Sequence, residues 1–185
     1  MKTPLDSSGV LAQQNELETM LLLQAVENGE GAHNNLAYAI AAGEAAYDSG
    51  HTIVMPFYRN GSLRDYLSSM SDEGQCEPGE IQRITRDLLS ALDFIRRKEF
   101  VHRDVKPDNI LIDEDGTIAL ADFGCTVKFG ALTDRGTPQF DGPETINGEG
   151  HYLRTPAHYS MDLFSTAVML RSMMTFMVTL RALTI

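Results

Sequence analysis

The chain has 185 residues and a formal net charge of −11, from 26 acidic against 15 basic side chains. This length suits one ordinary domain with a sizeable core, and the acidity argues against nucleic acid or an anionic membrane surface as the main partner. Cys76 and Cys125 are too few and too far apart for a disulfide framework or a zinc site. Because the N-terminal residues also lack a secretory signal, we expect an intracellular, cytoplasmic protein with reduced thiols.

The first expected elements are a helix and a β-hairpin. Residues 11–26 carry apolar side chains on one broad helical face, and the helix is expected to stop at the glycine-containing residues 28–31. Residues 38–47 and 51–55 are predicted to pair as strands around a turn at residues 48–50.

Two further helices are expected next. Ser62 and Asp65 have the spacing of a capping box that opens a short helix, and residues 74–79 are typical of a loop. From residue 80 to residue 97, apolar side chains recur at helical spacing, so one face of this helix is expected to pack inward. These inward side chains are Ile81, Ile84, Leu88, Leu89, Leu92 and Ile95.

Residues 101–124 combine a hairpin pattern with a cluster of polar side chains. Residues 110–112 and 117–120 are predicted strands, joined by a turn in which Gly116 supplies the positive φ. The returning strand is expected to gather four polar side chains at one spot: Asp104, Lys106, Asn109 and Asp122.

This set of side chains suits phosphoryl transfer to a hydroxyl, in which a protein mainly positions groups and offsets charge. Asp104 would orient the hydroxyl and take its proton. Asn109 and Asp122 offer the hard oxygen ligands that Mg²⁺ prefers, and Lys106 would offset the charge of the transferring phosphoryl group. The alternative is a chance polar loop beside a hairpin.

The C-terminal residues 161–185 are strongly apolar, which raises the question of a membrane span. Arg171 and Arg181 interrupt this stretch and leave apolar runs shorter than the ~20 residues that a span needs. We therefore expect a buried helix and no membrane span.

Two motifs in the central segment resemble those of a known family. The run His102-Arg103-Asp104-Val105-Lys106-Pro107-Asp108-Asn109, followed by Asp122-Phe123-Gly124, is similar to the catalytic loop and the metal-binding motif of eukaryotic protein kinases. A lysine two residues after the catalytic aspartate is typical of the serine/threonine branch. The resemblance implies an α+β, protein-kinase-like fold, ATP and Mg²⁺ as cofactors, and a protein substrate with a Ser or Thr acceptor.

The resemblance also implies a division of the chain. Residues 1–55 correspond to a residual small lobe, made of a helix and a β-hairpin, that lacks the first three strands. Residues 56–61 correspond to the hinge, and residues 62–185 to a partial, mainly helical large lobe. The large lobe would contain the catalytic loop, the activation segment and the central helix.

The resemblance implies that five residues help to form the nucleotide-binding site. Glu16 would pair with a strand lysine, or is instead a solvated helix acid. Met55 would bound the adenine pocket, while Pro56 and Tyr58 would offer a backbone carbonyl and an N–H to the adenine edge. Leu111 would pack beneath the ring and also belong to the core.

Five more residues acquire supporting roles. Arg103 would bind a phosphate placed on the activation segment, for which Thr133 is a candidate, and Thr137 would contact the catalytic Asp and Lys. Glu144 would end that segment in Gly-Pro-Glu, where Ala-Pro-Glu is usual. Asp162 would accept hydrogen bonds from the backbone of the catalytic loop, or merely cap its own helix.

The sequence departs from the family pattern towards both ends. No Gly-x-Gly-x-x-Gly occurs, Lys2 is the only lysine before Lys98, and only fifteen residues precede Glu16, too few for three strands. The later helices, which would cover an apolar face and supply an arginine partner for Glu144, are not recognised. We expect a partner to cover the apolar C-terminal helix at Leu170, Met173, Met174, Phe176 and Met177.

Three functions follow from these patterns. The first is a protein serine/threonine kinase domain, present as an incomplete chain. The second is a catalytically inactive, kinase-like (pseudokinase) binding or scaffold module, favoured by the missing glycine loop and strand lysine. The third is a small-molecule kinase, disfavoured by Thr137 and residues 142–144, which resemble a segment for docking peptide substrates.

Overall fold

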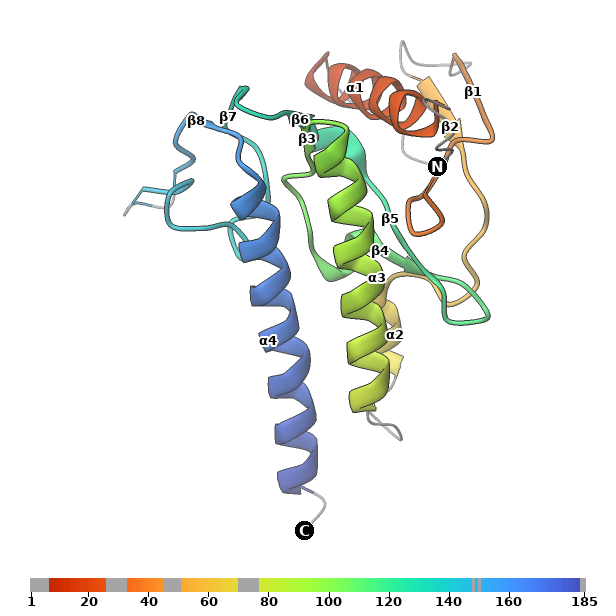
Figure 1. The fold of residues 1–185 in the computed structure, drawn as a ribbon, viewed down its shortest axis with the longest axis vertical. Coiled ribbons are helices and arrows are strands. Elements are labelled where there is room, and N and C mark those ends of the chain that lie inside the picture. The colour runs from red at the N-terminus through yellow and green to blue at the C-terminus, as the bar shows by residue number, and fades with distance from the viewer. Residues whose placement is uncertain are drawn as a thin grey trace.

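The computed structural model describes residues 7–25, 33–44, 51–69, 77–147, 149 and 151–183, and of residues 7–12, 44, 51 and 175–183 it describes the backbone. Within these ranges the chain forms four α-helices and four two-stranded antiparallel sheets. Helix α1 lies across one end of the molecule beside β1 and β2, and α2, α3 and α4 extend towards the other end (Figure 1). This mixture of helices and small sheets agrees with the expected α+β class.

Helix α1 (Ser7–Gln24) contacts the hairpin formed by β1 (Ala41–Glu44) and β2 (His51–Val54). Ala41 lies opposite Val54 in an antiparallel register, so the predicted hairpin is confirmed. The helix begins at Ser7, earlier than predicted. The expected helix stop at residues 28–31 and the expected turn at residues 48–50 lie outside the described residues.

Helix α2 (Leu63–Ser69) opens with the predicted capping box. Asp65 N donates to Ser62 Oγ at 3.1 Å, and Ser62 N donates to Asp65 Oδ2 at 3.0 Å. Each bond satisfies a backbone N–H that the start of a helix leaves open. The fully buried Leu63 fixes this helix to the core.

Replacing Ser62 by Ala is expected to lower the free energy of unfolding by about 1 kcal/mol, because an N–H of the first turn loses its acceptor. Ser68→Ala is the matched control, since Ser68 is exposed and its hydroxyl donates to Arg64 O within the same helix, away from the first turn. Urea unfolding followed by circular dichroism measures both variants. Equal losses in the two would contradict the capping role.

Helix α3 (Pro78–Arg97) is the predicted helix of residues 80–97, with one boundary and one side chain corrected. It begins at Pro78, so the end of the predicted loop is helical, because the missing N–H of proline costs nothing in a first turn. Leu89 is 41% exposed, since its side chain points about 100° away from that of Leu88. The fully inward side chains are Ile84, Leu88, Ala91, Leu92, Phe94 and Ile95.

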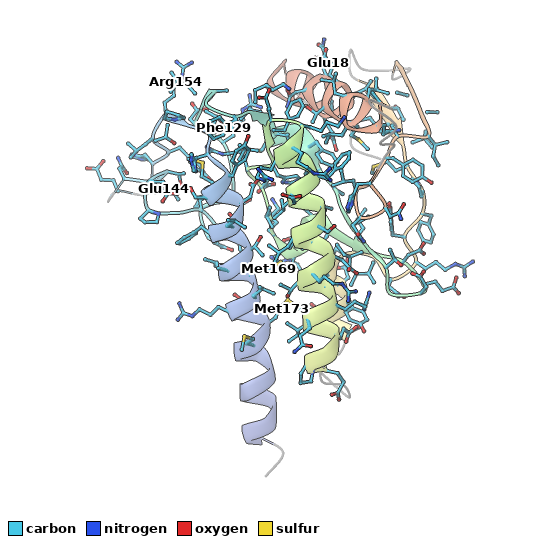
Figure 2. The ribbon with its side chains drawn as sticks, viewed as in Figure 1. Glu18, Phe129, Glu144, Arg154, Met169 and Met173 are labelled. Carbon is cyan, nitrogen blue, oxygen red and sulfur yellow. The ribbon has the colours of Figure 1, made fainter. Side chains whose placement is uncertain are left out.

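Helix α4 (Tyr159–Leu183) runs beside α3 (Figure 1). Met169 and Met173 lie between the two helices and belong to the main core (Figure 2). The prediction of a bare apolar face is therefore wrong for Met173, which is 1% exposed, while Met174 is 58% exposed. Leu170 is partly buried, and the side chains of Phe176 and Met177 lie outside the described residues. No described helix is long and apolar enough to cross a membrane.

The predicted central hairpin is present as β4 (Ile110–Ile112) and β5 (Ile118–Leu120). Ile110 pairs with Leu120 and Ile112 with Ile118, and Gly116 in the turn has a φ of 83°. The other small elements are β3 (Phe100–Val101), η1 (Pro107–Asn109), η2 (Phe123–Cys125), β6 (Val127–Lys128), β7 (Leu132–Thr133) and β8 (Thr155–Pro156).

Two connecting segments hold the β1–β2 end against this central hairpin. Ala37 N donates to Leu120 O, and Leu120 N donates to Asn35 O, both at 2.9 Å. On the other side, Ile112 N donates to Gly61 O at 2.9 Å. These bonds place α1 and β2 over the residues that follow β3 and β5, where the polar cluster lies.

Candidate active site

The Asp104 carboxylate is the centre of the polar cluster. Lys106 Nζ and Asn109 Nδ2 both donate to Asp104 Oδ2 at 2.8 Å, and Thr137 Oγ1 donates to Oδ1 at 2.5 Å. Lys106 Nζ also donates to Thr137 Oγ1 at 2.9 Å. Asp104 is only 7% exposed, so these donors replace most of its water. The two carboxylate oxygens are thus held in one orientation.

A second buried carboxylate supports the loop that carries Asp104. Asp162, in the first turn of α4, accepts hydrogen bonds from His102 N and Arg103 N, both at 2.8 Å. Arg103 has a φ of 71°, a conformation that a non-glycine residue adopts only with support from its surroundings. The Asp162 carboxylate supplies such support, because it fixes two successive backbone N–H groups.

The Arg103 guanidinium is buried against the segment that follows η2. Its Nη2 donates to Arg135 O at 2.5 Å, and its Nη1 lies 3.2 Å from Met161 Sδ. Thr133 is 7% exposed, and its hydroxyl accepts from Arg135 N at 3.4 Å. Phosphorylation of Thr133 would therefore require the β7–β8 pair to open.

A cavity of about 500 Å³ lies between α1, β2 and the polar cluster. It is lined by Gln13, Glu16, Ile53, Met55, Lys106, Asp108, Asn109, Leu111, Ala121 and Asp122. Asn109 Nδ2 donates to Asp104, so its carboxamide oxygen is the atom left to act as a ligand at the cavity. With the Asp122 carboxylate it forms a pair of hard oxygen donors, which fits Mg²⁺.

The other end of the cavity is apolar. It is lined by Met55 and Leu111, the two side chains to which the family resemblance assigns contacts with adenine. Pro56 and Tyr58 are not among the lining residues. Their expected contacts with the adenine edge are therefore not tested by the lining of the cavity. Burial of the Tyr58 side chain raises the pKa of its phenol.

The structure excludes one alternative for Glu16 and adds two polar residues to those predicted at the cavity, Gln13 and Asp108. Glu16 is 8% exposed and lines the cavity, so its interpretation as a solvated helix acid is wrong. Gln13, one helical turn before Glu16, lines the same cavity, and that spacing is the signal that would have predicted it. Asp108 also lines it and accepts two bonds from Arg64, which lower the pKa of its carboxyl.

Glu144 lies apart from this cluster. Its side chain is exposed in the segment beside α4 (Figure 2), and it forms no ion pair with another described residue. Its expected role at the end of the activation segment is not tested by any contact here.

His102 is fully buried, and burial is the main reason that its pKa lies below the usual value of 6.5. Its ring meets Phe123 edge-on at 5.3 Å, and Asp104 N donates to its Nδ1 at 3.3 Å. Nε2 has no hydrogen-bond partner among the described residues. The neutral ring therefore packs against Phe123 and also accepts a hydrogen bond from the backbone of Asp104.

Below pH ~6.5 the unfolded chain binds a proton at His102 that the folded chain does not, so lowering the pH should destabilise the fold. The loss grows as the pH falls from 7 to 5.5, because the unfolded chain takes up this proton over that range. In His102→Asn, the fall in stability over that range should be smaller than in the wild type, because other titrating groups remain in both. Urea unfolding at the two pH values measures it, and His151→Ala, an exposed histidine, is the control. Identical pH slopes in wild type and His102→Asn would contradict the prediction.

The protein kinase domain family matches residues 15–183 of this chain. A probable protein kinase of Dictyostelium discoideum is 31% identical over 161 residues, which cover 83% of this chain and 43% of that protein. Protein kinase 2 of the same organism is 35% identical over 121 residues, which cover 63% and 24%. The serine/threonine-protein kinase pak-2 of Caenorhabditis elegans is 35% identical over 126 residues, which cover 65% and 22%.

This chain spans less than half of the length of each of these relatives. The family match nevertheless includes Asp104 and, apart from Gln13, the residues that line the cavity, from Glu16 on α1 to Asp122 after β5. On this match, the chain belongs to the protein kinase domain family.

Proposed function

We propose that this chain carries the phosphoryl-transfer site of a protein serine/threonine kinase, which passes the γ-phosphate of ATP to a Ser or Thr hydroxyl of a protein. The observation that carries the proposal is the Asp104 carboxylate, held by Lys106, Asn109 and Thr137 beside the cavity. Membership of the protein kinase family supports it.

The cavity supports ATP and Mg²⁺ as cofactors. Its volume of about 500 Å³ suits a small-molecule ligand, and it has one apolar end, at Met55 and Leu111, and one polar end. Asn109 and Asp122 would hold Mg²⁺ through oxygen atoms. Bound Mg²⁺ and ATP would supply the phosphoryl group and help to neutralise its charge.

The residues around Asp104 have separate roles in this proposal. Asp104 would orient the acceptor hydroxyl and accept its proton through Oδ1, which accepts one hydrogen bond, from Thr137, and can accept a second, whereas Oδ2 already accepts two. Lys106 would place a positive charge near the transferring group. Arg103 and Asp162 would hold the backbone of the loop that carries Asp104 in its present conformation.

Thr137 supports a Ser or Thr acceptor. Its hydroxyl donates to Asp104 and accepts from Lys106. The Thr137 side chain therefore occupies part of the space beside the Asp104 carboxylate, where the acceptor side chain would enter. The relative named a serine/threonine-protein kinase also supports this choice. Glu144 would end the segment that docks the protein substrate.

A non-catalytic, kinase-like binding module is the second candidate. Lys106 is the only cation among the described residues that line the cavity, and the sequence contains no Gly-x-Gly-x-x-Gly. Both observations favour weak positioning of the ATP phosphates. Such a module would bind a partner through the exposed side of α4, where Leu163, Phe164 and Met174 are exposed.

The first test is Mg²⁺-dependent ATP binding by the purified chain. Ligand at about 100 times its Kd should raise Tm by roughly 5–10 °C. Asp122→Asn should abolish the Mg²⁺-dependent part of this rise, because it removes a charged ligand of the metal. Asp93→Asn, on the exposed face of α3, is the control and should behave as the wild type.

Two outcomes separate the candidates. A folded chain without any shift in Tm would contradict ATP binding and so the proposed function. A chain that binds ATP and transfers no phosphate to Ser, Thr or Tyr peptides would support the non-catalytic module, and transfer to Tyr peptides alone would contradict the assigned acceptor.

A further inference from the structure

Asn15, in the middle of α1, is joined to the backbone that follows Asp122. Its side-chain nitrogen Nδ2 lies 3.0 Å from Thr126 O, 3.3 Å from Gly124 O and 3.4 Å from Phe123 O. One amide group with two hydrogens is therefore shared among three carbonyl oxygens, all in or next to η2. The contact joins segments more than one hundred residues apart in sequence.

The backbone at this point needs such support. Asp122 has a φ of 65° and a ψ of 76°, in the left-handed region that costs energy for a residue with a Cβ. Thr126 N donates to Phe123 O at 3.0 Å and closes the turn, and Thr126 Oγ1 donates to His102 O at 3.3 Å. The direction of the Asp122 side chain thus depends on a turn that Asn15 holds from the side of α1.

The same helix forms one wall of the cavity. Gln13 and Glu16, on either side of Asn15 in sequence, line the cavity opposite Asn109 and Asp122. A shift of α1 relative to η2 would therefore change the distance between the two walls. Asn15 connects these walls by hydrogen bonds to backbone atoms, which keep their place when side chains move.

We propose that Asn15 is a positioning residue that sets the place of the Asp122 carboxylate and thereby the strength of Mg²⁺-dependent nucleotide binding. The proposal rests on the proposed function of the same site. Partners that orient a metal ligand from outside the coordination sphere commonly change metal affinity by about 10–100-fold when they are removed.

The test is ADP affinity with and without Mg²⁺, measured by calorimetry on the whole chain. In Asn15→Ala and Asn15→Leu, the gain in affinity that Mg²⁺ produces should fall by about tenfold, with Mg²⁺-free affinity within about twofold of the wild type. Asn15→Leu keeps the approximate size of the side chain and removes its donors without adding a charge, so it serves if the Ala variant folds poorly. Gln14→Ala is the matched control, because Gln14 is exposed and, among the described residues, its side chain bonds to Glu18 within the same helix.

A double variant shows whether Asn15 acts through Asp122. In Asp122→Asn, which should already lack the Mg²⁺-dependent gain, adding Asn15→Ala should have no further effect on affinity. The proposal would be overturned if the Asn15 variants lost the same ADP affinity with and without Mg²⁺. It would also be overturned if the loss of affinity from Asn15→Ala added fully to that from Asp122→Asn. If the wild type binds ADP with Mg²⁺ and the variants match it, this inference alone fails. If the wild type shows no Mg²⁺-dependent binding, the proposed function fails and the inference fails with it.

Discussion

Replacing Asp104 by Asn is expected to lower the rate of phosphoryl transfer by about 10²–10⁴-fold, because a carboxamide cannot take the proton of the acceptor hydroxyl. The change keeps the shape of the side chain, and the cavity wall formed by Asn109 and Asp122 is not altered. Nucleotide binding should therefore persist while transfer is lost. Transfer of labelled phosphate from ATP to a Ser/Thr peptide measures the rate, and the rise in Tm with ATP and Mg²⁺ measures binding.

Asp113→Asn is the matched control for this variant, since Asp113 is an exposed acid in the turn of the β4–β5 hairpin. It should leave both the rate and the rise in Tm unchanged. An Asp104→Asn chain that transfers phosphate at the wild-type rate would remove Asp104 from its proposed catalytic role. A loss of both binding and transfer in that variant would instead place Asp104 in nucleotide binding.

Replacing Asp162 by Ala is expected to lower the free energy of unfolding by about 3 kcal/mol. The backbone N–H groups of His102 and Arg103 would lose their buried acceptor, and each unsatisfied group costs about 1–3 kcal/mol. For a chain of this size, Tm should fall by roughly 6–12 °C. Thermal unfolding followed by circular dichroism measures the change.

Asp162→Asn separates the acceptor role from packing. The asparagine side chain has the same size as aspartate, but its one oxygen can satisfy only one of the two N–H groups. We therefore expect the free energy of unfolding to fall less than in Asp162→Ala, and still by a clear amount. Asp93→Ala removes exposed ion pairs with Arg96 and Arg97 and should change stability by no more than about 1 kcal/mol. If Asp162→Ala is as stable as Asp93→Ala, the carboxylate does not hold the loop.

Several elements could be predicted from the sequence because their causes are local. The β4–β5 hairpin follows from two apolar runs and Gly116, and the start of α2 follows from Ser62 and Asp65. The length of α3 follows from the spacing of its apolar side chains, apart from Leu89 and the first turn at Pro78. Periodicity shows that a face is apolar, and only packing against β5 and α4 determines how far around the helix burial extends.

The sequence by itself determined which chemical groups this protein brings to its site, because Asp104, Lys106 and Asn109 lie within six residues of one another and the hairpin returns the chain to Asp122. Only the tertiary structure decided that Glu16 faces the cavity, that Thr133 is buried, and that Asn15 bonds to the turn after Asp122. These contacts join segments that lie up to one hundred and eleven residues apart in sequence. The segments come together because their apolar side chains are buried in one core. Turn chemistry and periodicity act over a few residues, and so they cannot carry that information.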